Sequence, residues 1–448
     1  MVQNHHKKNH KRKKPEAGPD FFAPLSGLTY LEQLEKKNRT TEFFKSAVES
    51  ELEERCTARR YPIPQFSPKV ENIVSLPESL EISHRNKCEF TFGADGNLGF
   101  VKRVGVNFHI EPISETNPLV PKAMAAVIPV LKSGLSSFSV YSRVDHSGGL
   151  LRTASVRLGE DDKICLMIQI KEWEAGKQED GEDEVSRLKG VLLEIVEKNR
   201  DLNIVSLWLQ LNAGLCDASS SKAELLWGKK EGVEMRVCGL DFQVHPMSFF
   251  QTNTKACEML YSLVADWADE STEDKPLLLL DLCCGVGTIG QVLAKQVKAK
   301  SRVVGIEMIE EAVVDARLNA TRNFGKEASK ALRFEAGKVE DVLPKLLVEE
   351  LANCSDYQVV AIVDPPRNGL HANVLKALRD NHEIGTIIYV SCNPESLAKD
   401  TTLLVEPLTD CPEEEGFAVS KPFEANKVVA VDMFPNTAHC EMVLRLAR

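Results

Sequence analysis

Residues 251–448 place their apolar side chains in short unbroken runs that alternate with stretches of helical spacing. The first run, Leu277–Leu282, is followed at Gly287–Val297 by apolar residues that recur every three or four positions. Unbroken apolar runs are typical of strands buried on both faces, so the alternation predicts a mainly parallel sheet covered by helices on both sides. Val428–Met433 and Glu441–Leu446 are expected to close this sheet as an antiparallel hairpin. The other expected strands are Arg302–Glu307, Leu332–Glu335, Val359–Val363 and Ile384–Ser391, with helices near Glu310–Asn323 and Val339–Leu351.

The preceding part of the chain mixes short β-like runs with helical stretches, which predicts an α+β domain. The strands expected there are Cys88–Phe92, Leu150–Leu158, Ile164–Ile170 and Ile204–Leu211, and the helices are Pro121–Leu131 and Ser186–Arg200. Between Tyr30 and Arg59, apolar residues recur at roughly helical spacing, namely Leu31, Leu34, Phe43, Phe44, Ala47 and Leu52. We therefore expect a disordered basic tail at residues 1–20, a helical extension and linker at 21–79, a central domain at 80–250 and a C-terminal domain at 251–448.

Composition narrows the class of protein. The chain has 448 residues, of which 43% are hydrophobic, enough for two or three domains with substantial cores. No run approaches the roughly 18 apolar residues of a membrane helix, and no apolar segment follows the basic N-terminus, so we expect neither a membrane protein nor a secreted one. The twelve cysteines form no CxxC pair. Reduced thiols in the cytoplasm or nucleus are therefore expected, with a mitochondrial location less favoured.

Charge is unevenly distributed along the chain. The net charge is −11, yet His5–Lys14 carries six Lys or Arg residues and no acidic residue. The overall charge does not indicate nucleic-acid binding, so RNA phosphates would have to meet local basic surface. The tail is either a solubilising end or an arm for RNA contact or nuclear targeting, and the sequence leaves these alternatives open.

A glycine loop lies between the first strand and the first helix of the C-terminal domain. Gly285, Gly287 and Gly290 have the GxGxxG spacing of loops that approach a nucleotide at a helix N-terminus. Glu307 ends the next strand, where a carboxylate can accept hydrogen bonds from both hydroxyls of a ribose. The pattern fits a dinucleotide dehydrogenase, a methyltransferase with a nucleoside cofactor, or a structural turn.

The fourth strand of this domain separates these alternatives. It ends in Asp364, followed by Pro365, Pro366 and Arg367. A carboxylate beside a rigid Pro-Pro turn can hold a planar substrate at the mouth of a pocket. This element is typical of methyltransferases that act on bases and is unexpected in a dehydrogenase, although an ordinary rigid turn would also account for the prolines.

Cys392 ends the fifth strand and precedes a helix expected at Pro394–Leu404, whose N-terminal dipole would favour the thiolate. A thiolate that adds to C6 of a uracil enables C5 to take a methyl group, and a base must then remove the C5 proton. Glu441, at the start of the last strand, is expected to be this base, with His439 as its rival. Because His439, Cys440 and Glu441 are adjacent and cannot readily converge on one ion, no metal site is predicted.

Together these residues resemble those of the RNA 5-methyluridine (uracil-5-) methyltransferase family, particularly its animal tRNA-modifying members. The resemblance covers roughly residues 80–448, and the matching runs are Ser83–Phe90, Ser248–Asn253, Asp281–Gly290, Asp364–Leu370, Ser391–Pro394 and Phe434–Glu441. It implies an α/β fold with a Rossmann-like S-adenosylmethionine methyltransferase domain, built on a mostly parallel seven-stranded sheet with an antiparallel final hairpin. The central α+β domain would then bind RNA.

The resemblance also implies roles for individual residues. The nucleophile of the family falls on Cys392, and its proton-accepting glutamate falls on Glu441. The S-adenosylmethionine contacts fall on Gln251, Cys283, Thr288, Glu307 and Asp364. Cys283 and Thr288 differ from the aromatic residue and Asn of bacterial tRNA-modifying members. Arg85 and Lys87 lie where the RNA-facing domain begins and would meet phosphate.

The resemblance implies uridine 54 in the T-loop of tRNA as the substrate. Nothing in the sequence requires more than a monomer, and we expect neither a membrane nor a metal ion as a partner. Some bacterial relatives that modify rRNA carry a four-cysteine iron–sulfur cluster, but Cys56 and Cys88 are isolated here.

Two alternatives remain open. The same chemistry could act on rRNA, including mitochondrial rRNA, or the chain could be a tRNA-binding or folding factor without catalysis. A 5-methylcytosine methyltransferase would carry a cysteine beside the proline of the fourth-strand motif. This chain has Pro366 followed by Arg367 there, which argues against that class.

Overall fold

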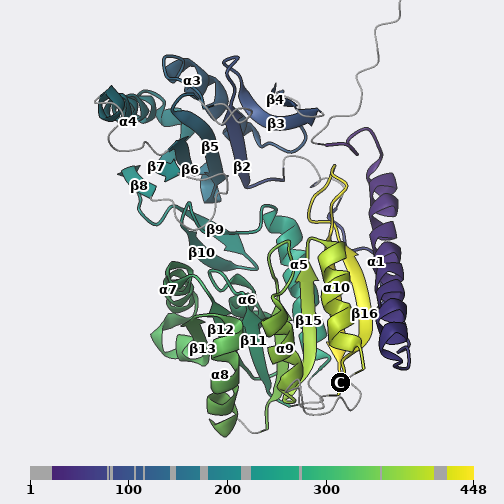
Figure 1. The fold of residues 1–448 in the computed structure, drawn as a ribbon. Helices are drawn as coiled ribbons and strands as arrows, with labels where there is room; N and C mark the ends of the chain where they lie inside the picture. Colours follow the sequence, from purple (N-terminus) through teal and green to yellow (C-terminus); the bar gives the residue numbers. More distant parts are fainter. Residues whose placement is uncertain are drawn as a thin grey trace, which may run out of the picture.

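A computed structural model describes residues 23–77, 80, 84–104, 107–114, 117–141, 148–171, 180–212, 223–271, 275–353, 356–407 and 421–448. The tail predicted at residues 1–20 lies outside the described residues. Two sheets, each with its own helices, lie one above the other in the view of Figure 1, and the long helix α1 (Tyr30–Arg59) runs along the edge of the lower one. Among the described helices, none has the length and apolar character needed to cross a membrane.

The C-terminal sheet has eight strands in the order β1-β16-β17-β15-β14-β11-β12-β13. Strands β11 to β15 pair in parallel, whereas β17 is antiparallel to both of its neighbours. This confirms the mainly parallel sheet with an antiparallel final hairpin. It has one strand more than the seven expected, because β1 from the proline-rich linker pairs with β16. The strands are β1 (Lys69–Val70), β11 (Leu277–Leu282), β12 (Ser301–Glu307), β13 (Leu332–Ala336), β14 (Gln358–Val363), β15 (Ile384–Ser391), β16 (Glu424–Val431) and β17 (Glu441–Ala447).

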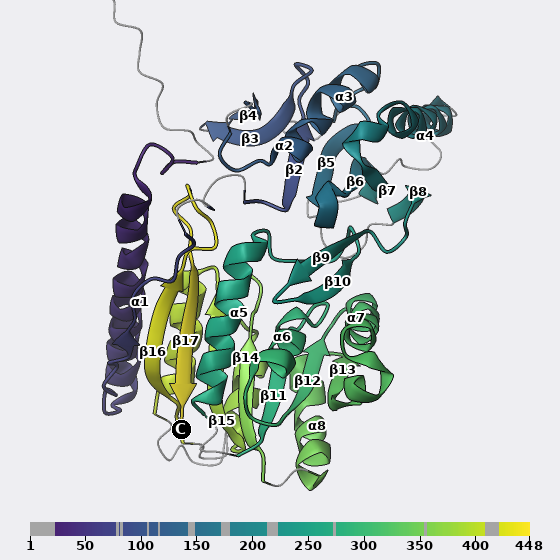
Figure 2. The same ribbon diagram turned by 180° about the vertical axis from the view of Figure 1, so that it is seen from behind.

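Helices cover both faces of this sheet (Figure 2), as the unbroken apolar strands predicted. Successive residues of β11 enter opposite cores: Leu277 and Leu279 pack with α5, α6 and α7, whereas Leu278 and Leu280 pack with α8, α9, α10 and α1. The helices are α5 (Thr254–Asp269), α6 (Thr288–Gln296), α7 (Glu310–Ala328), α8 (Val339–Asn353), α9 (Ala372–Asp380) and α10 (Pro394–Val405).

The central sheet has seven strands in the order β4-β3-β2-β5-β6-β7-β8. Its pairs are antiparallel except for β6 with β7, and helices α3 and α4 bury one face, so the predicted α+β architecture is confirmed. Strands β3, β4 and β8 escaped the sequence pattern because charged residues interrupt their apolar positions. The elements are β2 (Lys87–Phe92), β3 (Leu98–Val104), β4 (Asn107–Pro112), α2 (Lys122–Ala125), α3 (Val127–Gly134), β5 (Leu151–Leu158), β6 (Ile164–Lys171), α4 (Asp180–Lys198), β7 (Ile204–Asn212) and β8 (Ala223–Gly228).

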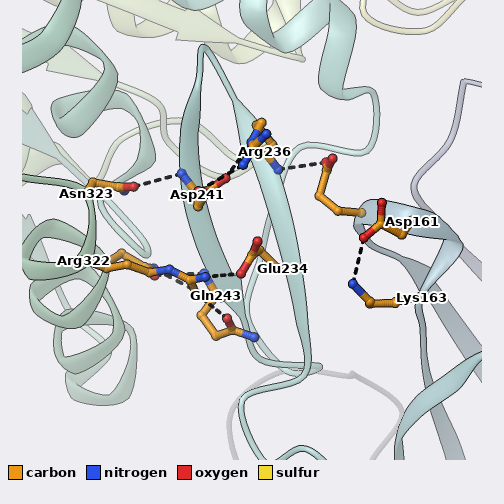
Figure 3. A network of polar contacts seen from close by, with 10 residues as sticks. Asp161, Lys163, Glu234, Arg236, Asp241, Gln243, Arg322 and Asn323 are labelled. Carbon is orange, nitrogen blue, oxygen red and sulfur yellow. Dashed lines mark hydrogen bonds and ion pairs between the residues drawn. The ribbon is translucent and has the colours of Figure 1, made fainter.

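A separate hairpin, β9 (Val233–Val237) with β10 (Leu240–Val244), joins the two parts through the polar contacts of Figure 3. On one side, the backbone N–H of Arg236 donates to Glu160 of the central domain at 3.2 Å. On the other, the N–H of Asp241 donates to Asn323 of α7 at 2.9 Å, and Arg322 of the same helix pairs with Glu234. The hairpin therefore ties the central sheet to the helix that follows β12.

Helix α1 is one continuous helix with a capping box, in which Thr29 accepts from the N–H of Glu32 and the Glu32 carboxylate accepts in return. Its buried face differs from the one that the apolar spacing predicts, since Leu31 is 73% exposed and Phe43 is 51% exposed. The buried positions are Tyr30, Gln33, Lys37, Thr41, Phe44, Val48, Leu52 and Cys56. The apolar pattern misplaced the face because the first half of the true face is polar.

The two adjacent phenylalanines of α1 test this orientation. Phe44→Ala should lower the free energy of unfolding by about 3–5 kcal/mol, because it removes a fully buried ring that packs edge-on against Phe66. Phe43→Ala should change it by no more than about 0.5 kcal/mol, as is usual for surface positions. Denaturant unfolding of both variants measures the difference, and equal losses would contradict the observed face.

Candidate active site

The glycine loop packs too closely against its surroundings to carry larger side chains. Gly287 has a φ of +73°, and a Cβ there would lie 2.7 Å from the ring of Phe334. A Cβ on Gly290 would lie 2.9 Å from a carboxylate oxygen of Asp281, which accepts the Gly290 N–H at 2.8 Å. Burial raises the pKa of Asp281 to about 7. Through these contacts the start of α6 packs against the end of β11. The N-terminus of α6 therefore lies at the carboxyl edge of the sheet.

Cys283, Thr288 and Glu307 converge around this loop. Glu307 is joined to the loop through one carboxylate oxygen, which accepts the Gly285 N–H at 3.0 Å, while the other accepts the Ile309 N–H at 3.0 Å. Cys283 adopts a left-handed φ of 65°. Burial, followed by the charge of Glu307, raises the pKa of the Cys283 thiol to about 12, so it remains protonated. Thr288 begins α6 and is buried.

Gln251 and Asp364 are hydrogen-bonded to each other. The Gln251 side-chain amide donates to Asp364 at 3.4 Å, and the Gln251 backbone carbonyl accepts from the Asn86 amide at 2.8 Å. The Asn86 backbone N–H donates to the carbonyl of Thr252 at 2.7 Å. The beginning of the central sheet therefore fixes the Gln251 segment, so the candidate site depends on both parts of the chain.

Cys392 lies at the junction of β15 and α10, as predicted, and its side chain is partly exposed. Asn393 caps α10 by accepting from the Glu395 N–H at 3.1 Å, and its amide donates to the carbonyl of Arg367 at 2.9 Å. Asp400 of α10 supports the same turn, because it accepts from the Leu370 N–H at 2.7 Å. The turn after Asp364 and the segment of Cys392 are thus held as one unit.

Glu441 lies beside Cys392 because of the strand register. Ser391 of β15 pairs with Met442 of β17, so the next positions along the two strands are Cys392 and Glu441. Glu441 is 2% exposed. Burial, and then the charge of Asp364, raises the pKa of Glu441 well above its usual range. A carboxyl buried in this way holds its proton more tightly than an ordinary surface Glu, and such groups can serve as acids or bases in catalysis.

Arg367 is a charged member of the site to which the sequence pattern assigned no role. Its guanidinium lowers the pKa of both Glu441 and Cys392 and also acts on His439. The Asp-Pro-Pro-Arg run could have indicated this role, since a rigid turn fixes the direction of the side chain that follows it.

The predicted preference for the Cys392 thiolate is wrong for the protein without substrate. Burial, and then the charge of Glu441, raises the pKa of the Cys392 thiol despite the adjacent N-terminus of α10. Loss of charge on the neighbouring carboxyls would therefore favour deprotonation of the thiol, although burial is the larger effect that opposes it.

His439 lies at the exposed rim of the site, and burial, followed by the charge of Arg367, lowers the pKa of its imidazole. Within the described ranges, no group of three or more His, Cys, Asp and Glu side chains is arranged to hold a metal ion.

Comparisons with known proteins give one consistent result. A sequence model described as tRNA (Uracil-5-)-methyltransferase matches residues 230–448. The mouse protein "tRNA (uracil-5-)-methyltransferase homolog A" is 31% identical over 451 residues, which cover 96% of this chain and 68% of the mouse protein. The human homolog B is 31% identical over 96% of this chain and 83% of its own length.

Among solved structures, that of a Pyrococcus abyssi tRNA (uracil-54, C5)-methyltransferase in complex with S-adenosyl-L-homocysteine superposes with a TM-score of 0.62. The two chains are 26% identical, and the match covers 95% of this chain and 86% of the other. The likeness therefore extends over both sheets.

The titration of Asp364 should appear in the stability of the free protein. Burial raises its pKa to about 7. Between about pH 4 and 7 the folded protein therefore keeps a proton that the unfolded chain releases, and the free energy of unfolding falls as the pH rises. Asp364→Asn should reduce this fall by about 1–3 kcal/mol, less than the full shift implies because the side chain keeps some solvent contact.

Urea unfolding at pH 5.0 and 7.5 measures this difference, with the exposed Glu424→Gln as a control that should follow the parent protein. An identical pH dependence in the parent and Asp364→Asn would contradict the raised pKa.

Proposed function

Because this chain belongs to the tRNA (uracil-5-)-methyltransferase family, we propose that it methylates C5 of uridine 54 in the T-loop of tRNA, with Cys392 as nucleophile and Glu441 as base. Members of this class methylate uracil in RNA with S-adenosylmethionine, and this chain is an enzyme of that class. The observation that carries the proposal is the buried carboxyl of Glu441 in register beside Cys392.

The chemistry explains why both residues are needed. C5 of uracil is a poor nucleophile until the Cys392 thiolate adds to C6 and places electron density on C5. S-adenosylmethionine supplies the electrophilic methyl group that C5 takes. The Glu441 carboxylate then removes the C5 proton, the C5–C6 double bond returns, and the sulfur of Cys392 leaves as thiolate. Arg367 lies near both groups and offsets the negative charge that would otherwise oppose thiolate formation.

The residues around the glycine loop fit a nucleoside cofactor. The backbone at Gly287 and Gly290 packs closely at the start of α6, and the Glu307 carboxylate accepts the Gly285 N–H of the same loop. Glu307 would hold the ribose hydroxyls of a bound cofactor. We assign cofactor contacts to Gln251, Cys283, Thr288, Glu307 and Asp364. Asp364 lies near enough to Cys392 to act on its thiol, and Gln251 donates to Asp364, so both would face the cofactor and the base.

The target RNA is proposed from the archaeal relative, whose name specifies uracil-54 of tRNA and whose likeness covers the central domain as well. We assign residues 80–250 to RNA binding and residues 251–448 to catalysis, in a monomer that acts in the cytoplasm or nucleus. Arg85 and Lys87 are the proposed phosphate contacts. The uridine must leave its stack to reach Cys392, at a cost of a few kcal/mol.

Two substitutions test the proposed chemistry. Cys392→Ala should abolish methyl transfer to tRNA and leave S-adenosylmethionine binding intact, because only the nucleophile is lost. Glu441→Gln should form a covalent protein–RNA adduct that persists, because the C5 proton cannot be removed. Transfer of a labelled methyl group, calorimetry and denaturing gels measure the three quantities.

Normal turnover in Cys392→Ala would disprove the nucleophile. Unchanged turnover without adduct in Glu441→Gln would transfer the role of base to another residue, for which His439→Ala is the matched variant.

The proposed target, position 54 of tRNA, can be tested separately. After incubation with labelled methyl donor, tRNA should contain 5-methyluridine at position 54 by nuclease digestion and nucleoside mass spectrometry. A U54→C transcript should accept no methyl group. Methylation of rRNA instead of tRNA, or 5-methylcytosine as product, would reject the proposed substrate.

A further inference from the structure

A lysine is buried completely where α1 meets the C-terminal domain. The Lys37 ammonium lies 2.5 Å from a carboxylate oxygen of Asp432, and both side chains are 0% exposed. The same ammonium donates to the backbone carbonyl of Phe434 at 2.9 Å. Both partners belong to the segment 432–440, which joins β16 to β17 and leads directly into Glu441; we call it the β16–β17 connection.

Other side chains of α1 contact the same connection one turn away. The Gln33 amide carbonyl accepts the Asn436 backbone N–H at 2.8 Å, and its NH₂ donates to the Asn436 side chain at 3.2 Å. Asn436 has a left-handed φ of 66°, which these bonds help to hold. A hydrogen bond with Thr40 acts on the thiol of Cys440, the neighbour of Glu441. Three successive turns of α1 therefore contact the connection: Gln33 contacts its middle, Lys37 its beginning and Thr40 its end.

Stability alone does not account for this polar contact. Burying an ion pair costs as much desolvation as the attraction returns, and apolar side chains of similar volume often stabilise as well or better. The other half of the same helix face already docks α1 through Phe44, Val48 and Leu52, which lie in the core under α10 and β16. Lys37 instead donates to the Asp432 carboxylate and to the Phe434 carbonyl, and these directional hydrogen bonds fix the position of the connection relative to α1.

The same helix also contacts the far end of α10. Arg55 forms two hydrogen bonds with Glu406, at 2.8 and 3.0 Å, and Glu406 ends the helix α10 that begins beside Cys392. This second contact lies at the end of α10 remote from Cys392. It therefore docks α1 without touching the catalytic edge, which makes it a matched control.

We propose that α1 is a positioning element of the active site, in which Lys37 holds the β16–β17 connection so that the Glu441 carboxyl faces the base attached to Cys392. The inference rests on the proposed role of Glu441. Lys37 touches neither substrate nor cofactor, so it acts only through the connection, and its loss should impair proton removal more than binding.

The test is Lys37→Met in the full chain. Turnover should fall by about 10- to 100-fold, part of the factor of about 10²–10⁴ that a placed base contributes. The KM for tRNA and the affinity for S-adenosylmethionine should change by less than about threefold, since neither contact is removed. The covalent adduct should persist as in Glu441→Gln, which a general loss of stability would not produce. The double variant Lys37→Met with Asp432→Asn leaves no unpaired charge, so it should fold and show the same defect.

Arg55→Met is the control. It should lower the melting temperature through loss of the Glu406 pair but keep the parent turnover per folded molecule, without adduct. Parent turnover in the folded double variant would overturn the proposal, and so would activity losses that track melting temperature in all variants without adduct. Adduct in Glu441→Gln but not in the Lys37 variants overturns this inference alone, whereas no adduct in Glu441→Gln overturns the assignment of the base itself.

Discussion

The antiparallel pairing of β17 with β15 is the constraint on which the site depends. In a wholly parallel sheet every strand ends at the carboxyl edge, and no strand begins there. Because β17 runs against β15, its first residue lies beside the position that follows the last residue of β15. Glu441 and Cys392, forty-nine positions apart in sequence, are neighbours for this reason. The remaining elements of the site, from the Asp364 turn to the glycine loop, lie at the same edge of the sheet.

Several carboxyls lie close together at this edge of the sheet, and their burial and mutual repulsion disfavour their charged forms. Asp281, Asp364 and Glu441 all have raised pKa values because burial disfavours their charge. Arg367 is the cation that opposes this effect at Glu441 and Cys392. The free site therefore favours a neutral thiol and neutral carboxyls, so Cys392 and Glu441 must each lose a proton before they can act as nucleophile and base.

Much of the fold follows from local pattern in the sequence. Unbroken runs such as Leu277–Leu282 specify buried parallel strands, and the glycine loop and the Asp-Pro-Pro turn identify the functional edge without any alignment. What the pattern could not give was contact between distant segments. Lys37 reads as a surface residue of a charged helix, yet it is buried, because its partner Asp432 lies in another part of the chain. The role of Arg367 and the added strand β1 were missed for the same reason.

The central claim is that Cys392 and Glu441 act on the same uridine, one to open the base to methylation and the other to release it. The most direct test is to isolate the adduct formed by Glu441→Gln with tRNA, digest both partners and sequence the cross-linked product by mass spectrometry. The account predicts that the peptide containing Cys392 is joined through sulfur to a uridine that already carries the methyl group, at position 54. A linkage through any other residue, or to an unmethylated base, would contradict it.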